Sequence, residues 1–172
     1  MEKGYIQIYT GDGKGKTTAA LGLALRAAGN GLNVFIAQFM KGQDYGELHS
    51  VKNIPQITIR QFGKPTFIHV DQATKEDIRM AQEGLAASRD AMKSGKYDII
   101  ILDEIFVTLY FRLLSEEDVL KFIAEKPESM ELILTGRKAS QQFIDLADLV
   151  TEMKEVKHYY QQGVMARPGI ES

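Results

Sequence analysis

Apolar residues recur along this chain with two periods, one typical of strands and one typical of helices. Short runs of Ile, Val, Leu, Phe and Tyr have the length of strands, and the segments between them repeat apolar residues on one helical face. The predicted strands are residues 5–9, 33–39, 56–62, 97–103, 131–136 and 149–156. The predicted helices are residues 17–28, 74–94, a short one from about 105, one from 115 to before Pro127, and 140–147.

This alternation of strands and helices predicts an α/β fold with a mostly parallel central sheet and crossover helices. The run 97–103 is almost wholly apolar, as expected for a strand at the centre of a parallel sheet. Residues 43–55 and 63–73 are the two longest irregular stretches. Long loops in compact domains are often functional, so both stretches are candidates for a binding site.

Two helices have recognisable first residues. Ser115, with Asp118 three residues on, resembles a capping box that opens a helix. The segment "TKED" from Thr74 to Asp77 imitates the guanine-reading motif of GTP-binding proteins, but it precedes Asp103 and opens a helix. A helix N-cap at Thr74, followed by acidic residues in the first turn, explains this segment better.

Composition favours one globular domain, residues 1–172, because the chain shows no internal repeat and no break in composition. With a formal net charge of −2 and a pI of about 5.9, it has no broad basic field to attract nucleic acid. The longest apolar stretch, residues 99–111, contains Asp103 and Glu104 and is too short to cross a bilayer. We therefore expect a cytoplasmic protein without nucleic-acid or membrane partners.

Several metal and thiol chemistries are excluded or disfavoured by residue type. The chain has no cysteine, which excludes disulfides, zinc ribbons, iron–sulfur clusters and cysteine nucleophiles. His49, His69 and His158 show no ligand spacing to one another. A transition-metal site is therefore not expected.

The segment "TGDGKGKTT", residues 10–18, lies between the first predicted strand and the first predicted helix. The amide hydrogens of such a glycine-rich loop converge on anionic oxygens, helped by the helix N-terminus. Lys16 would add a positive charge, and the Thr17 hydroxyl would ligate Mg²⁺. An ordinary glycine-rich turn explains this combination less well, so the segment predicts nucleotide binding.

This loop is one residue shorter than the usual pattern of Gly, four residues and Gly-Lys-Thr or Gly-Lys-Ser. Counting back from Gly15 puts Thr10 at the first position, whereas starting from Gly11 leaves only three residues between the two glycines. Two interpretations remain open. The segment is either a damaged kinase loop or a loop that holds triphosphate for a reaction other than phosphoryl transfer.

Asp103 and Glu104 stand at the end of the apolar strand 97–103. A carboxylate at the end of a strand beside the first one lies near the phosphates and can hold Mg²⁺ directly or through water. The alternative is that one of the two only caps the following helix. We expect one to be a metal residue and the other to be secondary.

Four other residues have both a functional and an ordinary explanation. Arg26 follows the loop on the first helix, and Arg137 follows the strand 131–136; solvated charges are favoured for both on spacing alone. Phe62 and Phe67 flank "GKP" in an irregular stretch. They either anchor the core or face a flat ligand.

Together these residues are similar to those of the P-loop-type ATP:corrinoid adenosyltransferases, which convert cob(I)alamin and its precursors to the adenosyl form. The resemblance runs from about Tyr5 to Glu171, and the short loop with "LILTGR", "DLAD" and "VKH" downstream is specific to this family among P-loop proteins. It implies a P-loop NTPase fold, a RecA-like three-layer sandwich. The segments that carry it are "TGDGKGKTTAALGLALRAAG", "QFMKG", "YDIIILDE", "LILTGR", "DLADLVTEMKEVKH" and "GVMARPGIE".

The resemblance implies transfer of the 5′-deoxyadenosyl group of ATP to the Co(I) centre of a corrinoid, with release of triphosphate, in adenosylcobalamin biosynthesis or salvage. The short loop is then expected to hold a shifted triphosphate, with the ribose 5′ carbon turned toward the corrin. Co(I) is itself a strong nucleophile, so the protein positions the reactants and stabilises the leaving group. Cobalamin, cobinamide and a cobyrinic acid diamide all remain open as the acceptor.

The same resemblance assigns roles to individual positions. Catalytic roles fall to Lys16, Thr17 and Glu104, with Thr17 and Glu104 on Mg²⁺, or Mn²⁺ in its place, and Asp103 as the secondary metal residue. A corrin would lie over the loops 39–42 and 63–69. The nucleotide and corrin contacts implied are Gly11, Asp12, Gly13, Lys14, Gly15, Lys16, Thr17, Thr18, Arg26 and Phe67.

Two positions depart from the family pattern. Asp12 stands where well-known members have Asn, and a carboxylate beside triphosphate is tolerable only if it turns outward or accepts loop amides. The corrin loop reads "PTFIHV" instead of containing Phe-Thr-Trp, and the chain has no tryptophan. Phe67 is our candidate for the aromatic residue that displaces the lower axial cobalt ligand, with Phe62 and His69 as the next ones to test.

Two rival functions remain. A nucleoside or small-molecule kinase also pairs a P-loop with a strand ending in Asp-Glu, but the zinc-ribbon cysteines of thymidine kinases are absent. A RecA-like ATPase or nucleotide-binding regulator is disfavoured by the acidic pI. For an adenosyltransferase, the resemblance further implies a homodimer and a reduced flavoprotein as electron donor.

Overall fold

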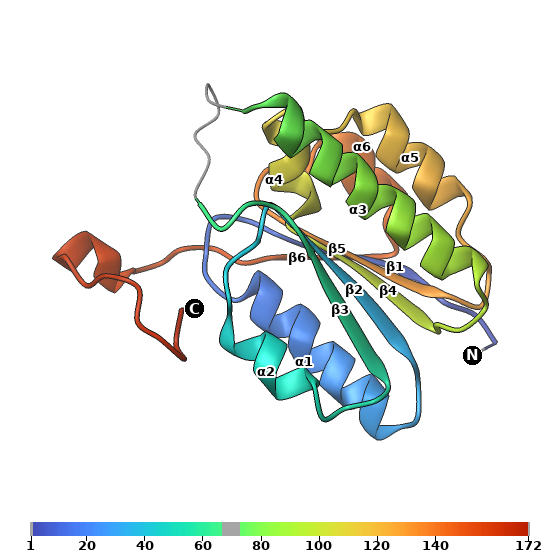
Figure 1. Cartoon of the computed structure of the whole chain (residues 1–172). Helices are drawn as coiled ribbons and strands as arrows, with labels where there is room; N and C mark the ends of the chain where they lie inside the picture. Colours follow the sequence, from blue (N-terminus) through green and yellow to red (C-terminus); the bar gives the residue numbers. More distant parts are fainter. Residues whose placement is uncertain (1, 67–72, 172) are drawn as a thin grey trace.

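The computed structural model of the chain describes residues 2–66 and 73–171 and shows one sheet between two layers of helices (Figure 1). All pairings in the six-stranded sheet are parallel, in the order β3-β2-β4-β5-β1-β6. The predicted α/β fold is therefore confirmed. The strands are β1 Ile6–Thr10, β2 Val34–Phe39, β3 Ile57–Phe62, β4 Ile99–Asp103, β5 Glu131–Thr135 and β6 Leu149–Glu152.

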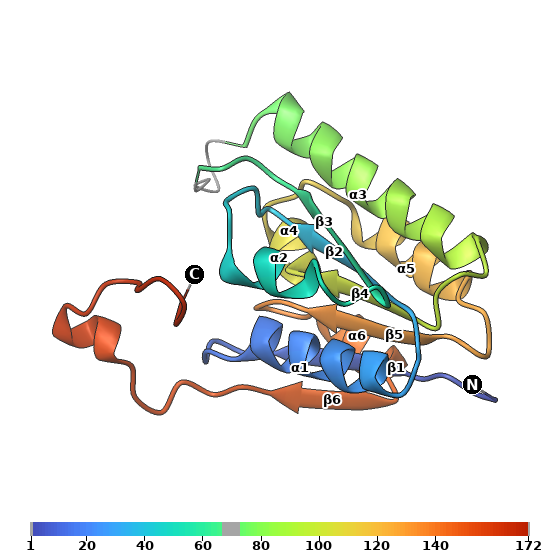
Figure 2. The same ribbon diagram turned by 60° about the horizontal axis from the view of Figure 1, so that its bottom comes forward.

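Helices cover both faces of the sheet, and this arrangement confirms the three-layer sandwich. α1 and α2 lie on one face, and α3, α4, α5 and α6 lie on the other (Figures 1 and 2). In the part of the chain that the structure describes, no helix is long and apolar enough to cross a membrane. The helices are α1 Lys16–Gly29, α2 Gly46–Val51, α3 Lys75–Lys93, α4 Ile105–Tyr110, α5 Glu116–Ala124, α6 Gln141–Leu146 and a 3-10 helix, η2, Tyr159–Gln162.

Two hydrophobic cores form because the inner strands are buried on both faces. Alternate residues of β4 point to opposite sides: Ile100 packs against α3 to α6, whereas Ile101 packs against α1. Every residue of β2, β4 and β5 is buried. The apolar run 97–103 therefore lies inside the sheet, as its composition predicts.

The predicted helix N-caps at Thr74 and Ser115 are both confirmed. Thr74 forms a capping box with Asp77, because its side chain accepts from the Asp77 amide and the Asp77 carboxylate accepts from the Thr74 amide. The "TKED" segment is thus the start of α3. The Ser115 hydroxyl accepts from the Asp118 amide at the start of α5.

Two expectations about irregular and extended segments were wrong. Residues 43–55 contain α2, a helix of six residues that is too short to show a clear helical period. The last strand ends at Glu152 and not at residue 156. Among residues 2–66 and 73–171, β6 pairs only with β1, and β1 ends at Thr10, so the residues after Met153 have no neighbouring strand there to extend the ladder.

Candidate nucleotide and metal site

A cleft of about 920 Å³ opens at the edge of the sheet where β1, β2, β4 and β5 end. Its volume is within the range of roughly 300–1,000 Å³ that holds small-molecule ligands. Open parallel sheets bind ligands outside the carboxyl ends of their strands, which is where this cleft lies. Its polar lining includes residues 12–18, Lys41, Glu104 and Arg137.

The glycine-rich loop between β1 and α1 is packed tightly against the backbone that follows β6. Gly11 has a φ of 94°, and a Cβ there would lie 2.5 Å from the Met153 carbonyl oxygen. The Gly13 amide donates to the same carbonyl oxygen at 2.6 Å, and a Cβ on Gly13 would also clash with it. Glycine is therefore required at both positions by close backbone approach and not only by flexibility.

Lys16 lies under this loop and is buried. Its ammonium donates to the carbonyl oxygens of Gly11 and Gly13, both at 2.7 Å. Burial lowers the pKa of Lys16, although the attraction of Glu104 opposes this shift. At its N-terminus α1 has no side-chain cap, so its first amides are available to bind an anion.

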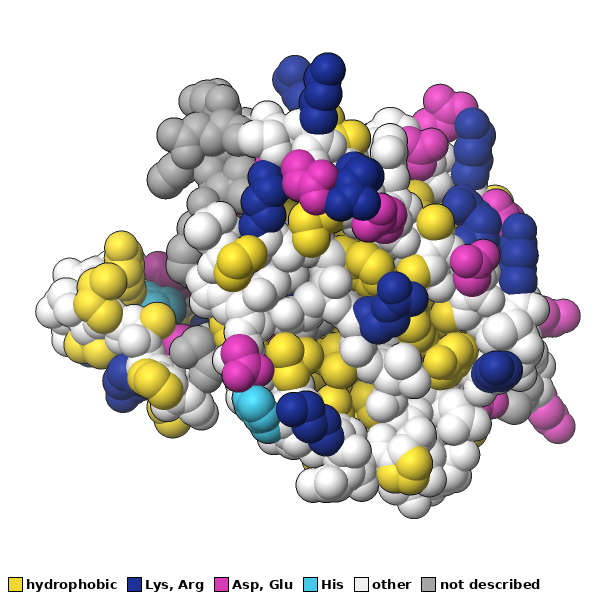
Figure 3. Space-filling model, in the orientation of Figure 1, with side chains coloured by type: hydrophobic (Ala, Val, Ile, Leu, Met, Phe, Trp, Pro, Cys, Tyr) yellow, Lys and Arg dark blue, Asp and Glu magenta, His cyan; other side chains and the backbone are white. Residues whose placement is uncertain are grey.

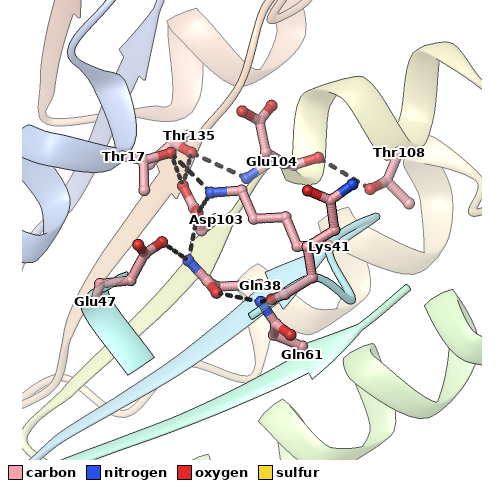
Figure 4. Close-up of polar contacts among 10 residues, drawn as sticks. Thr17, Gln38, Lys41, Glu47, Gln61, Asp103, Glu104, Thr108 and Thr135 are labelled. Carbon is pink, nitrogen blue, oxygen red and sulfur yellow. Dashed lines mark hydrogen bonds and ion pairs between the residues drawn. The ribbon is translucent and has the colours of Figure 1, made fainter. Parts of the chain in front are cut away.

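Asp103 is buried at the centre of a polar cluster below the cleft (Figure 4). Its Oδ1 accepts from the hydroxyls of Thr17 at 2.9 Å and Thr135 at 2.7 Å. Its Oδ2 accepts from Lys41 Nζ at 2.8 Å and Gln38 Nε2 at 3.3 Å. Both oxygens of Asp103 are thus occupied by donors of the chain.

Glu104 differs sharply from its neighbour. Its backbone is left-handed, with a φ of 64°, and its amide donates to the Thr135 hydroxyl at 3.0 Å. This geometry turns the Glu104 side chain away from the Asp103 cluster (Figure 4). Among the described residues, none donates a hydrogen bond to its carboxylate, which lines the cleft. Burial, and then the negative charge of Asp103, raise the pKa of Glu104.

The Thr17 hydroxyl and the Glu104 carboxylate form a donor set suited to Mg²⁺. This cation prefers oxygen ligands, keeps several waters and usually takes only one or two carboxylates plus substrate phosphates. In residues 2–66 and 73–171, no three His, Cys, Asp or Glu side chains converge to form a fuller protein cage. The residues present therefore fit a cation that is completed by phosphate oxygens and water.

Residues 2–172 match the family described as ATP:corrinoid adenosyltransferase BtuR/CobO/CobP. The chain belongs to this ATP:corrinoid adenosyltransferase family. This assignment supports ATP-dependent adenosylation of corrinoids and does not favour the kinase alternative.

Curated relatives agree with the family assignment. The corrinoid adenosyltransferase of Escherichia coli (strain K12) is 34% identical over 171 residues, which cover 99% of this chain and 86% of the relative. The corrinoid adenosyltransferase CobA of Salmonella typhimurium is also 34% identical, with the same coverage. An uncharacterized protein of Nostoc sp. is 36% identical over 169 residues, but these residues span 90% of this chain and only 45% of the relative.

The other loop positions expected to bind nucleotide line the cleft. Gly15, with a φ of 121°, leads into α1, and Thr18 lines the cleft on the first turn of that helix. Asp12 is exposed at the rim of the cleft, which is consistent with an outward-turned carboxylate. Lys14 lies on the outer side of the loop, where its ammonium donates to the Ile170 carbonyl oxygen at 3.0 Å.

One expected nucleotide contact does not line the cleft: Arg26 is exposed in the last turn of α1 and is not among the lining residues. Phe67 and His69, the expected corrin-loop candidates, lie outside the described residues. Phe62, the other aromatic candidate, is buried and packs beside Phe39 in the hydrophobic core.

Several residues of this cleft were not selected as site residues from the sequence, although Arg137 had a functional as well as an ordinary explanation. Lys41 lies just after the end of β2, and it pairs with Asp103, which is 62 positions further along the chain. Arg137 lines the cleft although spacing alone favoured a solvated charge. Residues 169–171 also line it, and the "GVMARPGIE" segment was the signal that could have drawn attention to them.

Proposed function

We propose that this protein transfers the 5′-deoxyadenosyl group of ATP to the Co(I) centre of a corrinoid and releases triphosphate. The observation that carries the proposal is that this family member has a shortened P-loop beside the uncapped N-terminus of α1. The Glu104 carboxylate lines the same cleft, where it could bind a cation. In this reaction the electron pair of Co(I) forms the bond to C5′ while the bond from C5′ to the triphosphate oxygen breaks. The triphosphate carries away the electron pair of the broken C5′–O bond, so no proton needs to be removed.

The chain's own residues bind and orient the leaving group. The loop amides and the α1 N-terminus hold phosphate oxygens, and Lys16 lies close enough to neutralise charge that develops on them. Lys14 adds a second positive charge on the outer side of the loop. A divalent cation held by Thr17 and Glu104 would supply further neutralisation of the triphosphate, with Asp103 supporting the Thr17 hydroxyl.

The phosphorus product tests this proposal against both rivals. The protein is incubated anaerobically with ATP, Mg²⁺ and chemically reduced cobalamin, cobinamide or cobyrinic acid diamide, and the products are separated. Inorganic triphosphate with an adenosylated corrinoid is the expected result. ADP with a phosphorylated acceptor would instead support a kinase, and ADP with phosphate would support an ATPase. The acceptor with the highest kcat/KM identifies the natural substrate class.

Phe67 is proposed to fill the place of the lower axial cobalt ligand, because a phenyl ring cannot coordinate and burying it contributes about 1.5–3 kcal/mol. Losing the axial donor makes Co(II) easier to reduce. Phe67→Ala should therefore slow turnover that starts from Co(II) with a biological reductant and spare transfer to chemically generated Co(I). The spectrum of the Co(II) corrinoid bound with ATP should lose its four-coordinate signature. An equal fall in both reactions would favour a simple loop anchor and move the test to Phe62 and His69.

The resemblance also supports a homodimer and a reduced flavoprotein as electron donor, and the composition of the chain supports a cytoplasmic location; all three are proposals. The molar mass in solution, measured by light scattering, tests the dimer against the 19.3 kDa of one chain. Transfer supported by a reduced flavoprotein in place of a chemical reductant tests the donor.

A further inference from the structure

The Lys41 ammonium lies between the two side chains that connect the P-loop to β4. Its Nζ is 2.8 Å from Asp103 Oδ2 and 3.3 Å from Thr17 Oγ1 (Figure 4). The Lys41 side chain is 16% exposed and that of Asp103 is 1% exposed. This ion pair is therefore largely shielded from water, and its charges interact more strongly than those of a surface pair.

The surroundings hold Lys41 in this place. Tyr45, at the start of α2, has its ring centroid 5.6 Å from Lys41 Nζ. Gln38 donates to Asp103 Oδ2 beside Lys41, and Gln38 itself donates to Glu47 at 3.0 Å and accepts from Gln61 at 3.2 Å. Four elements thus contribute to one network: α2 and the ends of β2, β3 and β4.

A divalent cation that approached Asp103 would meet a positive charge already bound to that carboxylate. Oδ2 is held by Lys41, and Oδ1 is held by the hydroxyls of Thr17 and Thr135. Glu104, the next residue, faces the cleft without such a partner among the residues described. The two adjacent carboxylates are therefore unequal because one has an internal counter-ion.

We propose that Lys41 is the positioning residue that reserves Asp103 for Thr17 and directs the divalent cation to Glu104. This inference rests on the proposed metal-dependent function and assigns a role to a residue that touches neither phosphate nor metal in the proposed arrangement. Without the Lys41 charge, Asp103 becomes an uncompensated carboxylate beside Glu104. The pair then attracts a divalent cation more strongly, but at a shifted position between the two carboxylates.

The proposal predicts opposite effects on metal affinity and on the reaction rate. Removing this lysine should tighten the binding of a metal ion and at the same time slow the reaction. A role limited to stability predicts no tightening, because it acts through folding and not through the charge seen by the cation. Removing a unit positive charge a few Å from a partly buried cation site should raise the affinity for the cation roughly tenfold or more.

The test measures Mn²⁺ alone, without ATP or corrinoid, by the loss of the free-ion electron paramagnetic resonance signal. Lys41→Met should bind Mn²⁺ roughly tenfold more tightly than the wild type. Lys41→Arg, which keeps the charge, is the matched control and should bind Mn²⁺ like the wild type. Lys41→Gln keeps a hydrogen-bond donor for Asp103 without the charge, and it carries the test if Lys41→Met does not fold.

A double-mutant comparison locates the effect. In an Asp103→Asn background, Lys41→Met should no longer tighten Mn²⁺ binding, because the carboxylate that it exposes is absent. Unchanged or weaker Mn²⁺ binding by folded Lys41→Met and Lys41→Gln would overturn the inference. This readout is independent of the transfer reaction, so a failure to detect inorganic triphosphate would contradict the proposed function without changing the Mn²⁺ result.

Discussion

Two neighbouring carboxylates show how much the surroundings of a single residue decide its chemistry. Asp103 is buried and accepts from Thr17, Thr135, Lys41 and Gln38. Glu104 begins α4 with a left-handed backbone and faces the cleft. A carboxylate whose lone pairs are already occupied is a poorer metal ligand than one that is available. At this scale, Asp103 is bound within the chain, whereas Glu104 is the carboxylate that we propose binds the cation.

Exchanging each carboxylate for its amide should separate these two roles. Glu104→Gln should raise the Mg²⁺ concentration required for half-maximal transfer far more than Asp103→Asn does. Of the two carboxylates, Glu104 is the one expected to touch the metal. Asp103→Asn should instead lower the free energy of unfolding by about 3–5 kcal/mol, since it leaves the shielded Lys41 ammonium without its counter-ion. Mg²⁺ titration of turnover and denaturant unfolding measure the two effects. The opposite order of Mg²⁺ dependence would assign the metal to Asp103.

Lys16 and Thr17 should be essential for turnover but not for folding. Lys16→Ala and Thr17→Ala each remove a group expected to act on phosphate or metal, and a loss of about 10²–10³ in kcat is typical for one such electrostatic contact. Circular dichroism and melting temperature provide the control for folding. Transfer within a few-fold of the wild type in either folded variant would contradict the assignment of this loop.

At the scale of elements, the C-terminal segment 158–171 is held to the P-loop through one lysine. Lys14 Nζ contacts the Tyr159 hydroxyl at 3.3 Å and the Glu171 carboxylate at 3.1 Å. Glu171 also accepts from the Arg167 amide at 2.8 Å and from the Tyr159 hydroxyl. Glu171 thus connects Tyr159 and Arg167 within this segment. Its outer surface carries exposed hydrophobic side chains (Figure 3), among them Tyr160 and Met165.

Removing the Glu171 carboxylate should release this segment. Glu171→Ala removes the common partner of Lys14, Arg167 and Tyr159, so chymotrypsin should cleave after the exposed Tyr160 at least several-fold faster than in the wild type. Glu128→Ala, an exposed glutamate outside this contact, is the matched control and should leave the rate unchanged. Equal cleavage rates in both variants would show that the segment is held by other contacts.

The docking of this segment should also resist mild acid. Hydrogen bonds from Arg167, and then from Tyr159, hold the pKa of Glu171 far below its usual range. A carboxylate with a lowered pKa contributes its stabilisation above the ordinary glutamate pKa of about 4.3 and loses it only as the pH falls through the lowered value. Cleavage by an acid-stable protease should therefore stay slow near pH 4 and rise only at lower pH. A rise already at pH 5 would contradict this pairing.

At the scale of the whole molecule, α3 packs very closely against the sheet at one of its glycines. Gly84 in α3 lies directly against the rings of Phe39 and Phe62, at the ends of β2 and β3. A Cβ on Gly84 would be 2.8 Å from the Phe39 ring and 2.9 Å from the Phe62 ring. This close contact sets the distance between α3 and the ends of the strands that lead into the cleft loops.

Gly84→Ala should therefore destabilise the protein although alanine favours helix formation. Overpacking costs about 1–3 kcal/mol, which exceeds the gain of about 1 kcal/mol in helix propensity. Gly29→Ala, at the end of α1, is the matched control, because a Cβ there meets nothing within 4 Å. Its effect should be neutral or slightly stabilising in denaturant unfolding. Stabilisation by Gly84→Ala would show that α3 moves outward at little cost.

Features that depend only on residues close together in the sequence could be predicted from it. Strand and helix periods and the caps at Thr74 and Ser115 arise from local backbone preferences, so the α/β fold and the position of the glycine loop between β1 and α1 could be predicted. The strand 97–103 was identified for the same reason. Its almost wholly apolar composition indicates burial on both faces.

Other features were decided only when distant parts of the chain came together. The pairing of Lys41 with Asp103, the packing of Met153 on the glycine loop and the contact of Glu171 with Lys14 join residues 62, 140 and 157 positions apart. No local pattern marks these partners, because their contact depends on the order of the strands in the sheet. The sequence by itself determined that Asp103 and Glu104 both stand at the end of a buried strand. The tertiary structure decided which of the two carboxylates is neutralised, because that depends on a lysine carried there by another strand.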